Sequence, residues 1–118
     1  MAADLATFDL GTARWDAVVS IWCHLPSALR RDVHARVVRA LRPGGVVLLE
    51  AYRPAQLGRG TGGPPVADML PDLASLRTEF AGLDELLGRE VERDVREGRG
   101  HGGNSAVVQF LARKPPAP

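Results

Sequence analysis

Cysteine is nearly absent from this 118-residue chain, which contains only Cys23. A single cysteine excludes an intrachain disulfide framework and a zinc site built on cysteine pairs, and it fits a reducing cytoplasm. No apolar run approaches the roughly 20 residues that a membrane-spanning helix needs. Residues 1–4 also lack the basic start and apolar core of a secretion signal. We therefore expect a cytoplasmic protein that does not enter a membrane.

An excess of either charge is lacking as well, because 15 basic residues are balanced by 14 acidic ones and the formal net charge is +1. Without an overall field, neither nucleic acid nor an anionic membrane is expected as a partner. The three histidines are far apart in sequence, so no metal site is expected. The remaining composition, 45% hydrophobic and 25% charged residues with 13 glycines, is typical of one globular domain.

The first half of the chain predicts a strand, a helix and a second strand. Residues 16–22 and 46–52 are short apolar runs without alternation, as in parallel strands buried on both faces. The arginines of residues 30–39 are expected on solvated faces of the intervening helix, and Pro43-Gly44-Gly45 should end it. The helix itself is predicted over 26–41 by apolar residues at four-residue spacing: Leu29, Val33, Val37 and Leu41.

The second half predicts a loop, a short helix and a hairpin. Residues 53–69 are crowded with glycine and proline, which is typical of a functional or a disordered loop. Asp72 can cap a helix over 72–81. Alternating residues then predict two antiparallel strands within 86–113.

These elements predict an α/β domain over residues 1–113, followed by a flexible tail, 114–118. The expected fold is a partial Rossmann-like sheet with parallel strands, crossover helices and a C-terminal antiparallel hairpin. Ligands of open α/β sheets bind beyond the carboxyl ends of the parallel strands. Residues 21–25 and 50–53 occupy those positions here.

His24 is the best-placed titratable residue at this edge, where it can act as a general base or bind backbone groups near the helix start. Glu50 and Tyr52 end the second strand on one face, where they can position a substrate or bond across the strand ends. For Cys23 a packed residue is favoured over a reactive thiol. For His34 a partly buried structural histidine is favoured over a ligand.

Two glycine-rich stretches imitate the G-x-G-x-x-G pattern, at residues 58–63 and 98–103. A phosphate-binding loop must leave a strand and open a helix, so that its N–H groups converge on the ligand. The first stretch runs into Pro64-Pro65 and the second lies within the predicted hairpin. Flexible loops are therefore favoured over cofactor loops at both places.

Residues 15–20 (WDAVVS) and 41–46 (LRPGGV) carry a family resemblance. They resemble the fourth-strand motif and the start of the fifth strand in class I S-adenosylmethionine-dependent methyltransferases. The predicted order of elements is similar to the C-terminal half of that fold and covers nearly the whole chain. Further features resemble a bacterial subgroup close to the tellurite-resistance methyltransferases: His24-Leu25-Pro26, Tyr52, Gly62-Gly63-Pro64 and His101.

The resemblance implies S-adenosylmethionine as cofactor and transfer of its methyl group to a small-molecule acceptor. His24 would be the catalytic residue. Asp4 and Leu5 correspond to the family's adenine-binding position, and Ile21 and Trp22 complete the implied cofactor side. The implied substrate side consists of Glu50, Tyr52, Gly62, Gly63 and His101.

The family's glycine loop and the carboxylate after its second strand have no counterpart in the sequence. We therefore expect weak or absent cofactor binding by this chain alone. The alternative to an enzyme is a non-catalytic interaction or split-enzyme module. In either case residues 16–22 would form an exposed sheet edge, which predicts a homo-oligomer or a partner chain supplying the missing half.

Overall fold

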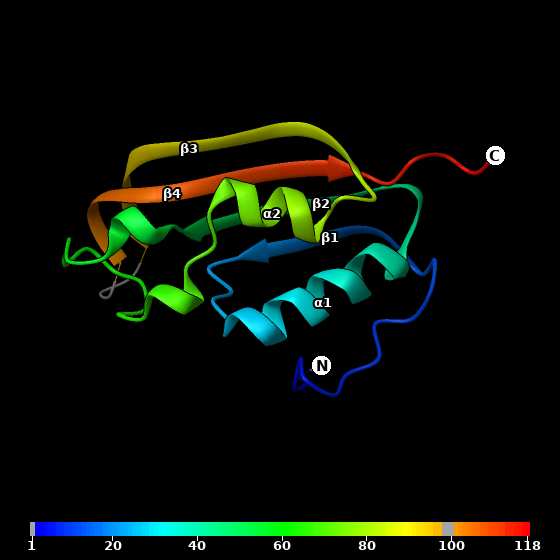
Figure 1. Cartoon of the computed structure of the whole chain (residues 1–118), viewed down its shortest axis with the longest axis horizontal. Helices are drawn as coiled ribbons and strands as arrows, with labels where there is room; N and C mark the ends of the chain where they lie inside the picture. Colours follow the sequence, from blue (N-terminus) through cyan, green and yellow to red (C-terminus); the bar gives the residue numbers. More distant parts are fainter. Residues whose placement is uncertain (1, 98–100) are drawn as a thin grey trace.

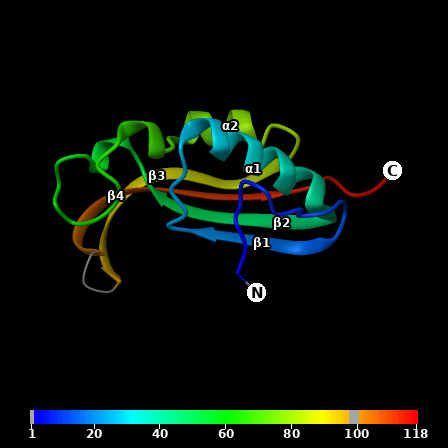
Figure 2. The same cartoon turned by 90° about the horizontal axis from the view of Figure 1, so that it is seen from below.

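A computed structural model of the chain describes residues 2–97 and 101–118, and it shows one four-stranded sheet with both α-helices on the same face (Figure 1, Figure 2). Two 3-10 turns lie in the connection between the second strand and the second helix. The elements in chain order are β1 (Trp15–Ile21), α1 (Ser27–Ala40), β2 (Leu41–Tyr52), η1 (Pro54–Gln56), η2 (Ala67–Met69), α2 (Leu73–Glu79), β3 (Asp84–Glu97) and β4 (His101–Arg113).

The strand order in the sheet is β1-β2-β4-β3. β1 pairs with β2 in parallel through the intervening helix α1, and β4 pairs antiparallel with both β2 and β3. This arrangement confirms the α/β fold class, with its parallel pair and closing hairpin. The carboxyl ends of β1 and β2 consequently lie side by side, at the end of the sheet where both parallel strands terminate.

The helix α1 ends at Ala40, because Leu41 is already extended (φ −71°, ψ 136°) and begins β2. Pro43 lies two residues beyond this C-cap, where proline cannot continue a helix, but the prediction that the glycines cap the helix was wrong. The pairing of β1 with β2 shifts between Trp15↔Leu41 and Ala17↔Val46, so these residues form a bulge. Gly44 has φ +83° in this bulge, a conformation that favours glycine.

Burial of the parallel strands on both faces was also predicted wrongly. Val19 is 64% exposed on β1, and Leu48 is 44% exposed on β2. The reason is that both α-helices cover the opposite face and β1 lies at the edge of the sheet (Figure 2). Only the face towards the helices belongs to the main core.

Asp72 caps α2 as predicted, because its Oδ1 accepts a hydrogen bond of 2.7 Å from the Ser75 amide. The helix is shorter than predicted and ends at Glu79.

The main core fills the space between the sheet and the two helices. Its buried residues are Val33, Val37, Leu41, Val47, Leu49, Ala51, Leu76, Phe80, Leu83, Val108, Phe110 and Ala112.

Two arginines of α1 are not on solvated faces, contrary to the prediction. Arg30 is only 6% exposed, because its guanidinium pairs with Glu79 of α2. The Arg36 guanidinium donates to the carbonyl oxygens of Leu5 and Phe8, the latter at 2.7 Å. Arg36 thereby fixes the N-terminal segment against α1.

Lys114 is fixed as well, although the predicted tail begins there. Its Nζ donates to the carbonyl oxygens of Val38 and Leu41, each at 2.8 Å. A cation at the end of a helix satisfies carbonyl groups that lack an intrahelical donor.

Among the described residues, no helix has the length and apolar character that a bilayer crossing requires.

Candidate functional site

The carboxyl ends of β1 and β2 are joined by a stack of aromatic rings. The ring centroids of Trp22 and Tyr52 are 4.5 Å apart, and those of His24 and Tyr52 are 5.5 Å apart. Tyr52 is fully buried in this stack. Trp22 has φ +54°, a left-handed conformation that is rare for a bulky residue and is found most often at functional sites.

His24 connects the end of β1 to the backbone of β2. Its Nε2 accepts a hydrogen bond of 2.9 Å from the amide of Tyr52. This nitrogen therefore carries a lone pair and no proton. The neutral ring then carries its proton on Nδ1, and the hydrogen bond of Nε2 corresponds to the backbone-binding alternative. A role of His24 as general base, which stays a prediction, would require Nε2 to leave the Tyr52 amide.

Glu50 is part of a charge network on the sheet face opposite the helices. Arg93 donates to both of its carboxylate oxygens, at 2.6 and 2.8 Å, and Gln109 donates at 2.7 Å. Burial alone would raise the pKa of Glu50, but these hydrogen bonds hold it below the ordinary carboxyl value. The carboxylate is thus ionised and bonded across the strands, as in the second of its two predicted roles.

The glycine-rich stretch 58–63 is bonded to the start of β4. Thr61 Oγ1 contacts Ser105 Oγ at 2.9 Å, and Gln56 Nε2 donates to the Gly62 carbonyl at 3.1 Å. The stretch does not open a helix, so its N–H groups do not form a phosphate loop. It lines a shallow concavity of about 350 Å³ that also includes Pro64 and Pro65.

Gly63 lies directly against the ring of Tyr52. A Cβ at this position would come within 2.9 Å of Tyr52 Cδ2, and the residue has φ +85°. The close approach requires glycine, and it attaches the loop to the aromatic stack. Gly62 and Gly63 stay predicted substrate residues. His101 begins β4, but its side chain lies outside the described part of the chain, as do residues 98–100 of the second glycine-rich stretch.

Replacing Gly63 with alanine tests this contact, and Gly58→Ala is the matched control. Gly58 has a similar φ of +81°, but a Cβ there would meet no neighbouring atom. We therefore expect Gly58→Ala to lower the free energy of unfolding by about 1–2 kcal/mol through backbone strain alone. Gly63→Ala carries the same backbone strain and must also displace the Tyr52 ring, so we expect about 1–3 kcal/mol more. Urea unfolding followed by tryptophan fluorescence measures both losses. Equal losses would show that the loop does not pack on Tyr52.

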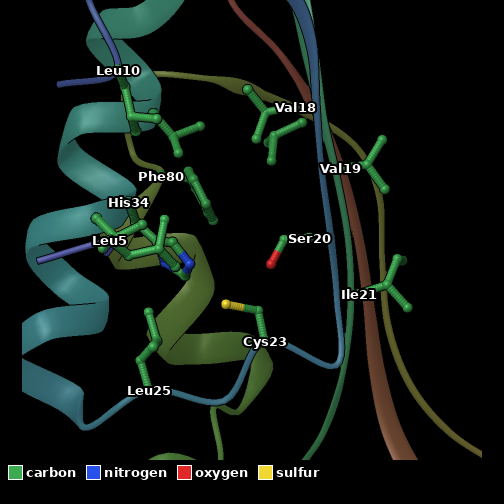
Figure 3. A pocket seen from close by; sticks show the side chains of 13 residues that line it. Leu5, Leu10, Val18, Val19, Ser20, Ile21, Cys23, Leu25, His34 and Phe80 are labelled. Carbon is green, nitrogen blue, oxygen red and sulfur yellow. The ribbon is translucent and has the colours of Figure 1, made fainter. Parts of the chain in front are cut away.

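A second hollow lies between α1 and the edge strand β1 (Figure 3). Its volume is 210 Å³, and Leu5 of the N-terminal segment and Ile21 of β1 both line it. Both predicted cofactor residues border the hollow, but the Ile21 side chain points to the other side of β1 from Leu5 (Figure 3). Asp4 precedes Leu5 and accepts a hydrogen bond of 2.9 Å from the Ala6 amide, which forms a local turn.

Cys23 also points towards this hollow and is exposed (Figure 3). The prediction of a packed cysteine is therefore only partly right. Partial burial of the sulfur raises the pKa of the Cys23 thiol, so the group is protonated at neutral pH. This does not favour the reactive-thiol alternative.

His34, whose structural role was predicted, belongs to a buried ionic cluster with Glu79 and Arg30. Nδ1 of His34 lies 2.7 Å from Glu79 Oε1, and the Arg30 guanidinium donates to both oxygens of the same carboxylate. All three side chains are at most 8% exposed. Within residues 2–97 and 101–118, no group of three or more histidine, cysteine, aspartate or glutamate side chains is placed to hold a metal ion.

The fold is shared with solved structures of methyltransferases. A SAM-dependent methyltransferase from Methanosarcina mazei aligns with 98% of this chain and 66% of its own, at 14% identity and a TM-score of 0.68. TehB from Haemophilus influenzae aligns with 97% of this chain and 40% of its own, at 15% identity and a TM-score of 0.73. A chain from a complex of a methyltransferase activator with a methyltransferase, from Haloferax volcanii, covers 98% and 61%, at 14% identity and a TM-score of 0.68.

These likenesses show the shared fold and nothing further, because the sequence identities are only 14% to 15%. The chain spans between 40% and 66% of the length of the three structures. No protein-family profile matches the chain, and no curated protein sequence matches it.

Proposed function

We propose that this chain forms the C-terminal part of a methyltransferase domain that transfers a methyl group from S-adenosylmethionine to a small-molecule acceptor. The observation that carries the proposal is the alignment of nearly the whole chain with a Methanosarcina mazei SAM-dependent methyltransferase. The likeness to TehB supports the tellurite-resistance-like subgroup. The aromatic stack at the carboxyl ends of β1 and β2 lies where open α/β sheets bind their ligands.

The residues at this edge fit part of the cofactor. Leu5 offers an apolar side chain in the hollow beside α1, and the neighbouring Asp4 adds a carboxylate. The Ile21 side chain lies on the other side of β1 (Figure 3). The adenine ring of the cofactor would use the apolar contact, and its amine would use the hydrogen-bond acceptor. The Trp22 ring is covered by Tyr52 and lies 5.7 Å from the Arg93 guanidinium, so a ligand would meet its edge and its backbone.

When bound, S-adenosylmethionine supplies an electrophilic methyl group for direct displacement by the acceptor. The contribution of this chain is to position the acceptor against that group. Gly62 and Gly63 line the concavity proposed as the acceptor site, and the buried Tyr52 ring supports Gly63 from behind. Glu50 fixes Arg93 on the neighbouring strands. His24 holds the ends of the two strands together, and its Nε2 would bind an acceptor proton only after leaving the Tyr52 amide.

The proposal is tested by mapping S-adenosylhomocysteine on the ¹⁵N-labelled chain by NMR. We expect millimolar ligand to shift amide signals at Asp4 and Leu5 and at residues 21–24, because these residues form the proposed adenosine surface. Guanosine at the same concentration is the matched control, since it lacks the adenine amine. Shifts confined to residues 58–63, or equal shifts with guanosine, would contradict the proposed cofactor side.

A further inference from the structure

A short turn over residues 4–8 carries two of the proposed cofactor residues, Asp4 and Leu5. The Asp4 carbonyl accepts hydrogen bonds from the Thr7 and Phe8 amides, at 3.1 and 2.8 Å. Asp4 Oδ1 closes the turn as well, through its hydrogen bond with the next amide but one. A single helical turn is unstable by itself, because it fixes several residues for few hydrogen bonds. The turn therefore depends on support from the rest of the chain.

Arg36 of α1 gives this support through its guanidinium group. The group donates to the carbonyl oxygen of Phe8 at 2.7 Å and to that of Leu5. Its Nε donates to Asp32 Oδ2 at 3.0 Å, one helical turn earlier on α1, which fixes the orientation of the guanidinium. The Arg36 side chain is only 16% exposed, so water competes weakly for these hydrogen bonds.

The residues that follow the turn are attached to the fold independently of Arg36. The amides of Ala13 and Arg14 donate to carbonyl oxygens at the C-terminal end of α1, at 2.9 and 2.7 Å. For residues 4–8, by contrast, the hydrogen bonds to α1 within the described part of the chain both come from Arg36. Loss of the guanidinium would therefore release the turn and leave the rest of the segment in place.

We infer that Arg36 is a positioning residue of the proposed cofactor site, which holds the turn so that Asp4 and Leu5 can contact adenine. Leu5 lines the hollow beside α1, on the side where Arg36 holds its carbonyl group (Figure 3). The inference rests on the proposed function, because the adenine contact of these two residues belongs to that proposal. Arg36 acts through the population of the ordered turn, and a ligand that needs this turn binds more weakly in proportion to the fraction of molecules that lack it.

Arg36→Met in the full chain tests the inference. Methionine has a similar length and helix propensity but no hydrogen-bond donor. In ¹⁵N relaxation experiments, we expect the order parameters of the amides of residues 5–8 to fall from about 0.85, a rigid backbone, to below about 0.6. The dissociation constant of S-adenosylhomocysteine, measured from amide shifts at residues 21–24, should rise at least about fivefold, as it would if a fifth of the molecules or fewer kept the turn.

Two further variants separate this role from a general loss of charge or stability. Arg31→Met removes an exposed arginine from the same helix and should change neither the order parameters nor the dissociation constant. Arg36→Lys keeps the charge but not the planar fork, so both values should lie between those of wild type and Arg36→Met. Circular dichroism checks that all three variants are folded.

Disorder of the turn in Arg36→Met without weaker S-adenosylhomocysteine binding would overturn the positioning role. Weaker binding while the turn stays ordered, or an equal effect of Arg31→Met, would overturn it too. Each of these results leaves the proposed function intact, because wild type still binds the ligand at residues 21–24. The absence of any S-adenosylhomocysteine shift in wild type would instead reject the proposed function, and the positioning role with it.

Discussion

Glu79→Gln is expected to lower the free energy of unfolding by about 3 kcal/mol or more, because breaking a buried ion pair leaves its partner charge without compensation. Glu79 is the common acceptor for Arg30 and His34, at distances of 2.7 to 3.2 Å. Arg30 is buried beside it and cannot regain water without opening the contact between α1 and α2. Urea unfolding at neutral pH measures the loss.

The matched control is Glu92→Gln, which removes the carboxylate of an exposed pair with Arg59. Exposed pairs contribute little, so we expect a loss below about 1 kcal/mol. A triple variant with Arg30→Met, His34→Leu and Glu79→Leu should recover most of the stability, since apolar residues of similar size can replace a buried ionic cluster. A loss for Glu79→Gln no greater than for Glu92→Gln would contradict the role of the cluster.

The same cluster predicts a pH dependence. Burial alone would raise the pKa of Glu79, but hydrogen bonds from His34 and Arg30 hold it below its ordinary value. The stabilisation from this carboxylate is therefore fully present above about pH 4.3, the unfolded value, and is lost as the pH falls through the lower folded value. The difference in unfolding free energy between wild type and Glu79→Gln should shrink in that acid range. A difference that grows on acidification would show the opposite shift.

Tyr52→Ala is expected to lower the free energy of unfolding by about 3–5 kcal/mol, as is usual for a large aromatic residue removed from a core. The Tyr52 ring is fully buried and contacts Trp22, His24 and the backbone of Gly63. Its removal separates the strand ends from the glycine-rich loop. Thermal unfolding followed by circular dichroism measures the effect.

Tyr52→Phe is the control for this substitution, because it keeps the ring and removes only the hydroxyl group. We expect a loss of at most about 1.5 kcal/mol, because the buried ring and its stacking contacts are retained. If Tyr52→Ala and Tyr52→Phe lost the same stability, the ring stack would not be what joins the two strand ends.

The elements of the fold were predictable because their signals are local. The four-residue spacing of Leu29, Val33 and Val37 predicts α1, and Asp72 predicts the start of α2. The parallel pairing followed from two short apolar runs separated by that helix. The alternation that predicted the closing hairpin is equally local, so its strands were found although they are longer than predicted.

The exposure of β1 could not be read from its residue types alone. An apolar run of this kind has the same composition in the middle of a sheet and at its edge. Val19 is exposed because neither α-helix covers its face and, within the described part of the chain, β1 is an edge strand. The glycines at 44 and 45 were misassigned for a related reason. A left-handed glycine serves equally at the end of a helix and in a bulge, and only the pairing with β1 distinguishes the two.

The candidate site was predictable in position but not in its bonds. The carboxyl ends of β1 and β2 were identified from topology, and His24 and Tyr52 do lie together there. Their partners are distant in sequence: Glu50 binds Arg93, and Arg30 binds Glu79. Contacts between residues 28 to 49 positions apart leave no periodic pattern in the sequence, so Arg30 and Arg36 were wrongly expected on solvated faces.

The central claim is that this chain carries one side of a cofactor site and not the whole of it. Isothermal titration of the chain with S-adenosylhomocysteine tests it most directly. The account predicts affinity weaker than micromolar. Micromolar affinity of the chain would contradict it.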